Sequence, residues 1–579
     1  MKETLKYYKP YIPMILLVIL ALFGQAMCEL LLPKYMADII NSGIIPGDMN
    51  YIYRAGALML LISLVITICA ALGDYFAAKT AAKSSRDIRR ALFRNVTAFS
   101  DAELDQFSTA SLITRSTNDV QTVQNTTVMM LRMAIFAPLM GIGSVVRALQ
   151  TSVDLAWTIV LALICVLMVM LLAFILVMPK FKILQKKLDR LNLVISERLS
   201  GLLVVRAFTA EKHEESRFDQ ANIELRDLNI FVNRLMAFMM PAMNLIMSLS
   251  GVLIVWAGSK LVDIGGLLVG NMLAFMQYAM HVVMSFLFVT MIFIMIPRAA
   301  VSAGRIGEVL KTEPSVRDAE DCIDLTDPIG LIEFRNVSFA YPGAEEKALS
   351  NISFVANPGE TTAIIGGTGS GKSSLVSLIP RFHDVTEGQI LIDGTDIRQI
   401  SQKSLRDAIG YVPQKGILFS GTIESNLQYG KENAAEDEMR EAAEIAQAID
   451  FITEKPDGFC EEVAQGGTTV SGGQKQRLSI ARALMKKAQI NIFDDSFSAL
   501  DFKTDAKLRA SLKEKMKDST LLIVAQRINT IMDAEKIIVL DDGLIAGIGT
   551  HKELLKSCQV YQEIASSQLS EEELRKGAC

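Results

Sequence analysis

Cysteine and histidine are scarce in this chain. Its 579 residues include seven cysteines, scattered and without a C-x-x-C pair, and only four histidines. A disulfide framework needs an ordered cysteine pattern, and a zinc site needs clustered cysteine and histidine ligands, so neither is predicted. The scarcity favours a reducing compartment and argues against a metal enzyme.

A surplus of positive charge is lacking as well. The formal net charge is −5, so the basic surface that nucleic-acid binding requires is not indicated, and we expect no nucleic-acid partner. Apolar residues are abundant instead, because 51% of the chain is hydrophobic, the mean hydropathy is +0.33 and 28 residues are methionine. Such values are high for a soluble enzyme, and the length allows two or three domains.

The first half of the chain is predicted to cross a membrane. The N-terminal lysines precede an apolar run of full spanning length without a small-residue cleavage site, which favours a retained anchor over a signal peptide. Stretches of about 20 mainly apolar residues recur through this half. The six predicted spans are Tyr11–Leu32, Ala55–Ala77, Met129–Leu149, Leu155–Met178, Leu235–Val255 and Met272–Ile296.

The placement of basic residues predicts the orientation. Lys79–Arg94 and Lys180–Arg190 are dense in positive charge, whereas Asn41–Asn50 and Thr151–Asp154 contain no lysine or arginine. By the positive-inside rule, the N-terminus and the two basic segments are cytosolic. An even number of spans returns the chain to the cytosol near Arg298, so we expect a multi-pass protein of the plasma membrane with a cytosolic second half.

The two long cytosolic segments, residues 78–126 and 179–232, are charged and have a helical pattern. Each contains a short apolar or small-residue patch, Phe107–Arg115 in the first and Gly201–Phe208 in the second. One interpretation is a pair of solvated helical hairpins. The other is that the patches touch the cytosolic second half of the chain and transmit its motion.

Methionines recur about four residues apart in the last two spans, at Met236, Met240, Met243 and Met247 and at Met272, Met276, Met280 and Met284. Residues spaced in this way share one helix face. Ordinary packing and an adaptable lining for hydrophobic ligands both explain the pattern. Charged or polar side chains inside membranes are costly, and those predicted there are Arg132, Arg147, His281 and Asn244.

The second half contains a phosphate-binding loop that fits G-x-x-x-x-G-K-[ST]. It consists of Gly366, Gly367, Thr368, Gly369, Ser370, Gly371, Lys372 and Ser373, followed by Ser374. An apolar run precedes it and a helical pattern follows, which is the context that the motif needs. Lys372 is expected to reach the β- and γ-phosphates of a nucleotide, and Ser373 to hold Mg²⁺.

Further motifs accompany the loop. Tyr341 could stack on a purine or close a hairpin, and Gln414 is a candidate contact to Mg²⁺ or water. Ser471, Gly472, Gly473 and Gln474 open a helical run and predict a second anion site. A buried strand ends at Asp494 and Asp495, and Asp494 would hold Mg²⁺ indirectly.

Short strand-like runs alternate with helical patterns beyond residue 328, which predicts an α/β domain with a parallel sheet at its core. These runs are Leu331–Phe334, Thr362–Ile365, Ile390–Ile392, Ile490–Phe493, Leu521–Val524 and Lys536–Leu540. The predicted organisation is a membrane domain over residues 1–310, an acidic linker over 311–328 and a nucleotide-binding domain over 329–579.

This ordered set of motifs resembles the ATP-binding-cassette (ABC) exporters, as a half-transporter with six spans and one ATPase domain. The resemblance implies ATP and Mg²⁺ as cofactors and a second half-transporter as partner. It implies that Tyr341 stacks on adenine, that Gln414 is the Q-loop glutamine, and that Ser471–Gln474 is the signature motif. It also implies that each ATP lies between one subunit's phosphate loop and the other's signature.

Two positions depart from the pattern of an active family member. Asp495 stands where the catalytic glutamate is expected, and Gln526 replaces the switch histidine. Aspartate is one methylene shorter, which leaves its carboxylate about 1–1.5 Å short of the attacking water, and a displacement of that size can cost ~10²-fold in rate. The chain therefore resembles the degenerate-site subunit of heterodimeric bacterial multidrug exporters.

The leading hypothesis is a subunit of a heterodimeric exporter of hydrophobic compounds, whose own site binds ATP but hydrolyses it poorly. The alternatives are a homodimeric exporter of lipid, peptide or siderophore, and an ATP-gated membrane regulator that transports nothing.

Overall fold

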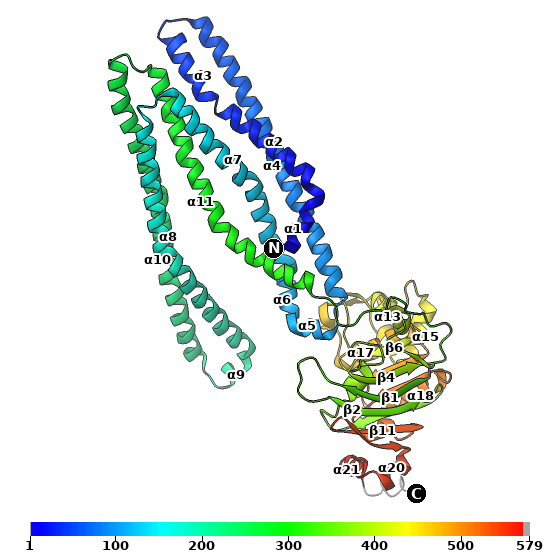
Figure 1. The fold of residues 1–579 in the computed structure, drawn as a ribbon. Helices are drawn as coiled ribbons and strands as arrows, with labels where there is room; N and C mark the ends of the chain where they lie inside the picture. The colour runs from blue at the N-terminus through cyan, green and yellow to red at the C-terminus, as the bar shows by residue number, and fades with distance from the viewer. Residues whose placement is uncertain (1, 571–579) are drawn as a thin grey trace. The chain divides into compact units, whose positions relative to one another are not determined.

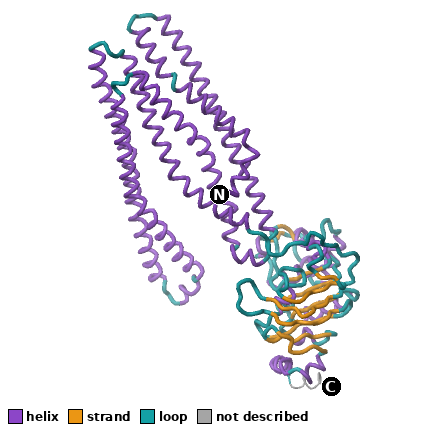
Figure 2. Tube along the Cα trace, in the orientation of Figure 1, coloured by secondary structure: helices purple, strands orange, loops and turns teal. Residues whose placement is uncertain are grey.

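A computed structural model describes residues 2–570 of the chain. The chain forms two compact units, the first of Met1–Arg94 with Ala110–Lys311, the second of Asn95–Thr109 with Thr312–Cys579. Figure 2 shows that the first unit is built of helices and that the strands gather in the second. The domain boundaries predicted from the sequence stay a prediction, and the excursion of Asn95–Thr109 into the second unit was not foreseen.

Long helices make up the first unit (Figure 1). They are α2 (Ile12–Glu29) continued by α3 (Leu32–Asp38), α4 (Met49–Thr97), α7 (Val120–Thr151), α8 (Ala156–Ser200), α10 (Glu211–Asp263) and α11 (Val269–Lys311). Within the described residues, six helical stretches are long and apolar enough to cross a membrane, which confirms the predicted number of spans. A helix of 49 residues such as α4 is ~74 Å long at 1.5 Å per residue, so it extends well beyond a hydrocarbon core of ~30 Å.

Helices α8 and α10 run side by side and are joined at one end by α9 (Leu202–Ala207), as Figure 1 shows. This turn is the second apolar patch predicted from the sequence. Its side chains are strongly exposed, with Leu203 at 81% and Phe208 at 80% of their full accessibility. A group of exposed apolar side chains is a candidate contact surface.

The second unit, over its described residues, holds a six-stranded sheet in the order β12-β11-β3-β10-β9-β6. The strands are β3 (Thr361–Gly366), β6 (Ile409–Val412), β9 (Ile490–Asp494), β10 (Thr520–Val524), β11 (Lys536–Asp541) and the antiparallel edge strand β12 (Leu544–Gly549). The other five are parallel and almost wholly buried, as expected for a sheet covered by helices on both faces.

A separate antiparallel sheet has the order β2-β1-β4-β5. Its strands are β1 (Ile332–Phe339), β2 (Leu349–Ala356), β4 (Glu387–Ile392) and β5 (Thr395–Asp396); the pair β7 (Gly421–Thr422) and β8 (Glu462–Val463) lies apart. Two of the predicted strand runs, Leu331–Phe334 and Ile390–Ile392, therefore do not belong to the parallel core. Local sequence marks an apolar strand but not the partner with which it pairs.

The main helices of the second unit are α12 (Lys372–Ser377), α13 (Gln402–Asp407), α14 (Ile423–Gln428), α15 (Glu436–Ile445), α16 (Ile449–Thr453), α17 (Gly472–Leu484), α18 (Phe502–Lys515), α19 (Ile528–Ile531), α20 (His551–Ser557) and α21 (Gln559–Gln568). Helices α12 and α17 matter most for function, because each begins at a glycine-containing motif.

The first cytosolic patch needs a correction. We predicted a tip at Phe107–Arg115, but the part that packs with the second unit is Asn95–Thr109, which contains α5 (Asp101–Phe107). Helix α5 starts with a capping box, in which the backbone N–H of Ser100 donates to Glu103 Oε2 at 2.8 Å. The S-x-x-E spacing of a capping box is visible in the sequence and could have marked this helix start.

The predicted linker lies along the second unit over part of its length. The carbonyl oxygen of Arg317 accepts a hydrogen bond from Arg381, and Asp318 accepts one from the backbone N–H of Gln402. An isolated bridge pairs Ile323 with Ile400. This stretch is therefore held to its unit by hydrogen bonds, although the sequence suggested only a polar connection.

Candidate functional site

The glycine-rich loop connects the end of β3 to the start of α12, as its sequence predicted. Gly371 has a φ of +93°, and a Cβ at this position would lie 2.8 Å from the carbonyl oxygen of Ala348. Glycine adopts such a backbone readily, whereas other residues are strained there. The tight turn lets the loop close into a cradle in front of α12.

Lys372 folds back into this cradle. Its Nζ donates to the carbonyl oxygens of Gly366 at 3.0 Å and Gly367 at 2.6 Å. Burial lowers the pKa of Lys372, while the nearby carboxylates of Asp495 and Asp494 act in the opposite direction. The ammonium of Lys372 is partly buried and donates to uncharged carbonyl oxygens. A negatively charged phosphate oxygen is a stronger acceptor and can replace them.

Asp494 is the last residue of β9 and is 4% exposed. Ser373 Oγ donates a hydrogen bond to Asp494 Oδ1 at 3.0 Å. Burial raises the pKa of Asp494, which shows how costly it is to keep this carboxylate charged without a cation. The pair therefore brings two oxygen atoms together beside the phosphate loop.

Asp495, the next residue, has a backbone φ of +47° and is held by two amides. Its Oδ2 accepts from Gln526 Nε2 at 2.8 Å and from Gln414 Nε2 at 3.3 Å. Burial raises the pKa of Asp495, and these amide hydrogen bonds oppose the rise. The two departures noted in the sequence are thus direct hydrogen-bond partners.

Tyr341 lies at the start of the β1–β2 connection and is 41% exposed. Its hydroxyl shares a 2.8 Å hydrogen bond with the hydroxyl of Ser374, in the first turn of α12. The ring packs edge-on against Phe339, with 4.8 Å between centroids. The structure therefore brings Tyr341, the phosphate loop and Ser374 together, and the Tyr341 side chain stays partly exposed, as stacking on a planar base requires.

The residues Ser471–Gln474 lie at the N-terminus of α17 and form a capping box. Gln474 N–H donates to Ser471 Oγ at 3.3 Å, and Ser471 N–H donates to Gln474 Oε1 at 2.9 Å. Within residues 2–570, no hydrogen bond or ion pair joins this motif to the phosphate loop. A Cβ at Gly472 would meet nothing within 4 Å, so the helix start is open to an approaching molecule.

The residues around Asp494 fit a magnesium ion. Ser373 Oγ and Gln414 Oε1 are hard oxygen ligands of the kind that Mg²⁺ prefers. Gln414 Oε1 is available because Gln414 Nε2 is the atom that donates to Asp495, and the Asp494 carboxylate would hold the ion indirectly, through Ser373 or water. Among the described side chains, no group of three or more His, Cys, Asp or Glu is arranged to hold a metal. Mg²⁺ would therefore need further oxygens from water and from a nucleotide's phosphates.

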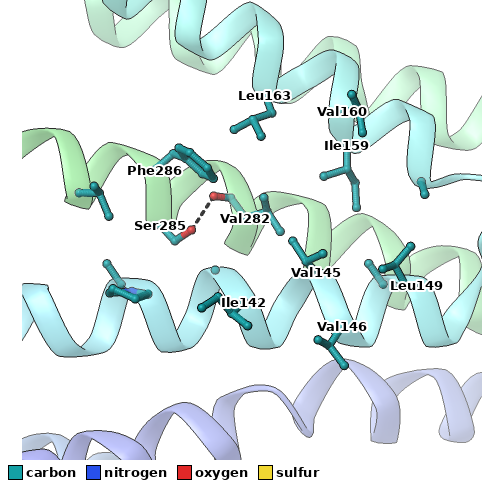
Figure 3. A pocket seen from close by; sticks show the side chains of 16 residues that line it. Ile142, Val145, Val146, Leu149, Ile159, Val160, Leu163, Val282, Ser285 and Phe286 are labelled. Atoms are coloured by element: carbon teal, nitrogen blue, oxygen red, sulfur yellow. Dashed lines mark hydrogen bonds between the residues drawn. The ribbon is translucent and has the colours of Figure 1, made fainter.

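The first unit contains an apolar cavity of about 670 Å³ between α7, α8 and α11 (Figure 3). Its walls include Ile142 and Val145 from α7, Ile159 and Leu163 from α8, and Phe286 from α11. Ser285 is the one hydroxyl in the lining, and its Oγ donates to the carbonyl oxygen of Val282 on its own helix. The cavity thus presents hydrocarbon to any occupant, and its volume is in the range of small-molecule sites.

The methionines do not line this cavity. Met272 and Met276 pack beside Gly258 and Gly251 of α10, and Met243 is buried. Met280 and Met284 are exposed on α11. The packing interpretation therefore accounts for the buried methionines, and the adaptable lining proposed from the spacing is not found in the cavity.

The charged and polar side chains of the predicted spans differ in their exposure and in their bonding partners. Arg132 Nε lies 3.1 Å from Asp74 Oδ1 on α4, so its charge is paired. Arg147 donates to Gln150 at 3.4 Å, and Asn244 is exposed. His281 Nδ1 is buried without a hydrogen-bond partner in the structure.

The fold and site define a class of protein: a membrane domain of six apolar helices joined in one chain to a P-loop ATPase domain. The chain belongs to the ABC transporter family. The family model of the ABC transporter transmembrane region matches residues 15–286, and the model named ABC transporter matches residues 349–498.

Relatives match over nearly the whole length. An uncharacterized ABC transporter ATP-binding protein of Mycobacterium tuberculosis is 39% identical over 97% of both chains. A Bacillus subtilis protein, provisionally named a multidrug export ATP-binding/permease protein, is 33% identical over 98% of this chain and 99% of its own. An ATP-dependent lipid A-core flippase of Pseudomonas aeruginosa is 31% identical over 98% and 96%.

A solved structure of a bacterial Atm1-family ABC exporter with ATP bound resembles the chain, with a TM-score of 0.78 and 26% identity over 97% of this chain and 99% of that one. The chain is therefore an ABC exporter with transport ATPase activity and a multi-pass membrane protein with a cytosolic ATPase domain. Its ATPase domain implies ATP binding, normally with Mg²⁺. Its fold implies a lipid bilayer around it and a hydrophobic transported substrate.

The backbone of the phosphate loop supplies a first test. Gly371→Ala should destabilise the ATPase domain, because a side chain at φ +93° costs about 1–2 kcal/mol and its Cβ would crowd Ala348. That cost corresponds to a fall of roughly 2–4 °C in Tm per kcal/mol for a domain of this size. Differential scanning calorimetry without nucleotide measures it. Gly367→Ala is the matched control, since its Cβ would meet nothing within 4 Å, and equal Tm values for the two variants would contradict the argument.

Proposed function

We propose that the chain is one subunit of a heterodimeric ABC exporter that moves hydrophobic compounds out of the cell across the plasma membrane, with its N-terminus in the cytosol. Its own nucleotide site holds ATP and hydrolyses it poorly. Its signature motif completes the competent site of a different half-transporter, where most of the hydrolysis takes place.

One observation carries this proposal: the carboxylate of Asp495 is bound by the amides of Gln526 and Gln414. A general base must accept a proton from water at the distance of a hydrogen bond. Asp495 is too short for the family's glutamate role, and its Oδ2 already accepts two N–H donors. Gln526, unlike histidine, cannot become a cation that stabilises the charge of the transferring phosphate.

The same residues support binding. Tyr341 offers its open ring to the adenine, the loop from Gly366 to Ser374 surrounds the phosphates, and Lys372 meets their charge. Ser373, Asp494 and Gln414 provide oxygens for Mg²⁺, which when bound would offset the charge of the phosphates. A site with all its binding groups and a poorly placed base keeps ATP bound for longer than a competent site does.

The signature motif supports a working role for the partner's nucleotide. Ser471, Gly472, Gly473 and Gln474 are all present, and the start of α17 is open. Free backbone N–H groups at a helix N-terminus are suited to bind an anion such as a γ-phosphate. The strongly exposed Leu203 and Phe208 beside α9 give independent support for a second subunit, because they need a covering surface.

The apolar cavity between α7, α8 and α11 supports hydrophobic compounds as substrates. Its lining has no charged group, and its only hydroxyl is satisfied within α11. A largely hydrocarbon molecule loses few hydrogen bonds to water on entering it, whereas a polar molecule would lose more.

A second candidate is a homodimeric exporter of lipid. The similarity to proteins named lipid A-core flippases favours it, and an acyl chain also suits a hydrocarbon cavity. The two candidates differ in the partner, which is a different half-transporter in the first and a second copy of this chain in the second. They differ also in whether this chain hydrolyses ATP without a different partner.

Restoring the two missing groups tests the degenerate site. Asp495→Glu combined with Gln526→His should raise ATP hydrolysis by the purified chain at least tenfold, because the carboxylate regains about 1–1.5 Å of reach and such displacements can cost ~10²-fold. Phosphate release measures the rate, and adding Lys372→Ala to the double variant should abolish the gain. A wild-type chain that already hydrolyses as fast as the double variant would show that the site is competent.

Removing the acidic side chain from each nucleotide site in turn is a second test of the degenerate site. In the complex with its native partner, Asp495→Asn should change the rate of hydrolysis by less than about twofold, since this carboxylate contributes little. Removal of the corresponding acid from the partner should abolish turnover. If Asp495→Asn by itself stops hydrolysis, the site is not degenerate.

The partner can be tested by purification. Co-expression with the product of the adjacent gene should yield a stable one-to-one complex through an affinity tag on this chain alone, because the exposed patch at α9 needs a covering surface. Size-exclusion chromatography with light scattering and quantitative mass spectrometry measure the ratio. A stable homodimer with full transport activity would refute the heterodimer.

Filling the cavity tests the substrate site. Leu163→Trp should lower ATP-dependent uptake of the dye Hoechst 33342 into inverted vesicles several-fold, because the larger ring occupies space between α7 and α8. Leu161→Trp, on the same helix but outside the lining and 41% exposed, is the control. Equal uptake by the two variants would remove this cavity from the transport route.

A further inference from the structure

His383 contacts both Tyr341, the candidate residue for stacking on a base, and the segment Asn95–Thr109, which packs in the second unit. It is 8% exposed. On one side its ring meets Tyr341, with 5.5 Å between centroids and an interplanar angle of 81°, and Phe339 at 5.3 Å. On the other side its Nε2 lies 3.7 Å from Asp101 Oδ2, in the first turn of α5. The His383 side chain thus lies between Tyr341 and helix α5.

The backbone that carries His383 is held firmly. It lies six residues beyond α12, in a turn where Arg381 is 4% exposed. Arg381 Nε donates to Asp384 Oδ1 at 2.6 Å, and its Nη2 donates to the carbonyl oxygen of Arg317 at 2.9 Å. The imidazole therefore cannot drift away from its two neighbours independently of the phosphate-loop helix.

Helix α5 is fixed in turn on its other side. Glu103 is 7% exposed and accepts from both the N–H and the hydroxyl of Ser100. Its second oxygen accepts from the backbone N–H of Ser315 at 3.3 Å. Asp101, by contrast, has a side chain that is 62% exposed, and it faces His383 from the start of this anchored helix.

We propose that His383 is a positioning residue that connects occupancy of the base site to α5. Its ring edge supports Tyr341, and its Nε2 side holds Asp101. The inference rests on the proposed stacking of a nucleotide base on Tyr341. Because packed interiors do not deform continuously, a small movement of Tyr341 under a bound base displaces His383 and, through it, the start of α5.

The two contacts of His383 can be separated by two substitutions. His383→Phe keeps an aromatic edge for Tyr341 and loses the nitrogen that faces Asp101. His383→Gln keeps an N–H donor and loses the ring. Asp101→Asn weakens the second contact from the other side, and Asp105→Asn is the matched control, an exposed carboxylate one turn further along the same helix.

Two measurements on the full chain in nanodiscs distinguish the contacts. The first is the affinity for the fluorescent analogue MANT-ATP. The second is the slowing of amide hydrogen exchange that ATP causes in the peptide that covers residues 97–109. In His383→Phe and Asp101→Asn, a merely structural role would change both together, or neither.

His383→Gln should weaken MANT-ATP binding by roughly three- to tenfold, the range for loss of an edge-to-face aromatic pair, and should also reduce the protection of residues 97–109 at saturating ATP, because the ring that follows Tyr341 is lost. His383→Phe and Asp101→Asn should each leave the affinity within about twofold and reduce the protection at least threefold. Their double variant should lose no more protection than either single variant, because they break one contact.

The inference is overturned if His383→Phe and Asp101→Asn protect residues 97–109 as well as Asp105→Asn does, or if ATP does not protect this peptide in the wild type. If His383→Phe does not fold, the exposed Asp101→Asn still decides the outcome. Tyr341→Ala separates this inference from the proposed function: unchanged MANT-ATP affinity in that variant would refute the base contact itself.

Discussion

Parallel pairing of β3, β10 and β9 is the constraint on which the nucleotide site depends. The register places Val524 opposite both Ile364 and Asp494, so the carboxyl ends of the three strands meet at one edge of the sheet. The phosphate loop leaves β3 at this edge, Asp494 and Asp495 end β9 there, and Gln526 follows β10. Buried backbone groups in neighbouring strands must pair, and this requirement brings together residues up to 160 positions apart.

The same arrangement brings the two departures from the family pattern into direct contact. Asp495 and Gln526 extend from adjacent strands, and the amide of Gln526 reaches the short carboxylate at 2.8 Å. A buried carboxylate without donors is costly, so an amide neighbour stabilises the folded site while it occupies a lone pair of Oδ2, one of the two oxygens that could act as a base. Stability and hydrolysis therefore place opposite demands on this position, which is consistent with a site that binds ATP and turns it over slowly.

The membrane half and the ATPase half are connected by more than the covalent linker. The chain leaves the first unit at Asn95, packs α5 into the second unit and returns by residue 110. His383, which contacts Tyr341 at the candidate base site, also lies beside Asp101 of this segment. In the second patch, at α9, Leu203 and Phe208 are exposed, which supports the proposal of a second subunit.

The sequence by itself determined the class of protein, because its strongest signals are local. Spans of about 20 apolar residues, the phosphate loop, the signature-like motif, and Asp495 and Gln526 as departures from the family pattern are all visible in short windows. Tertiary structure decided what depends on distant pairing. Two of the predicted strands belong to an antiparallel sheet. The segment of the first cytosolic loop that packs with the second unit is Asn95–Thr109, whereas the sequence had indicated Phe107–Arg115. The regularly spaced methionines of the last two spans do not line the cavity. Tertiary structure also joined Asp495 to Gln526 and Asp101 to His383, contacts that no local pattern encodes because they arise from how strands and helices are packed.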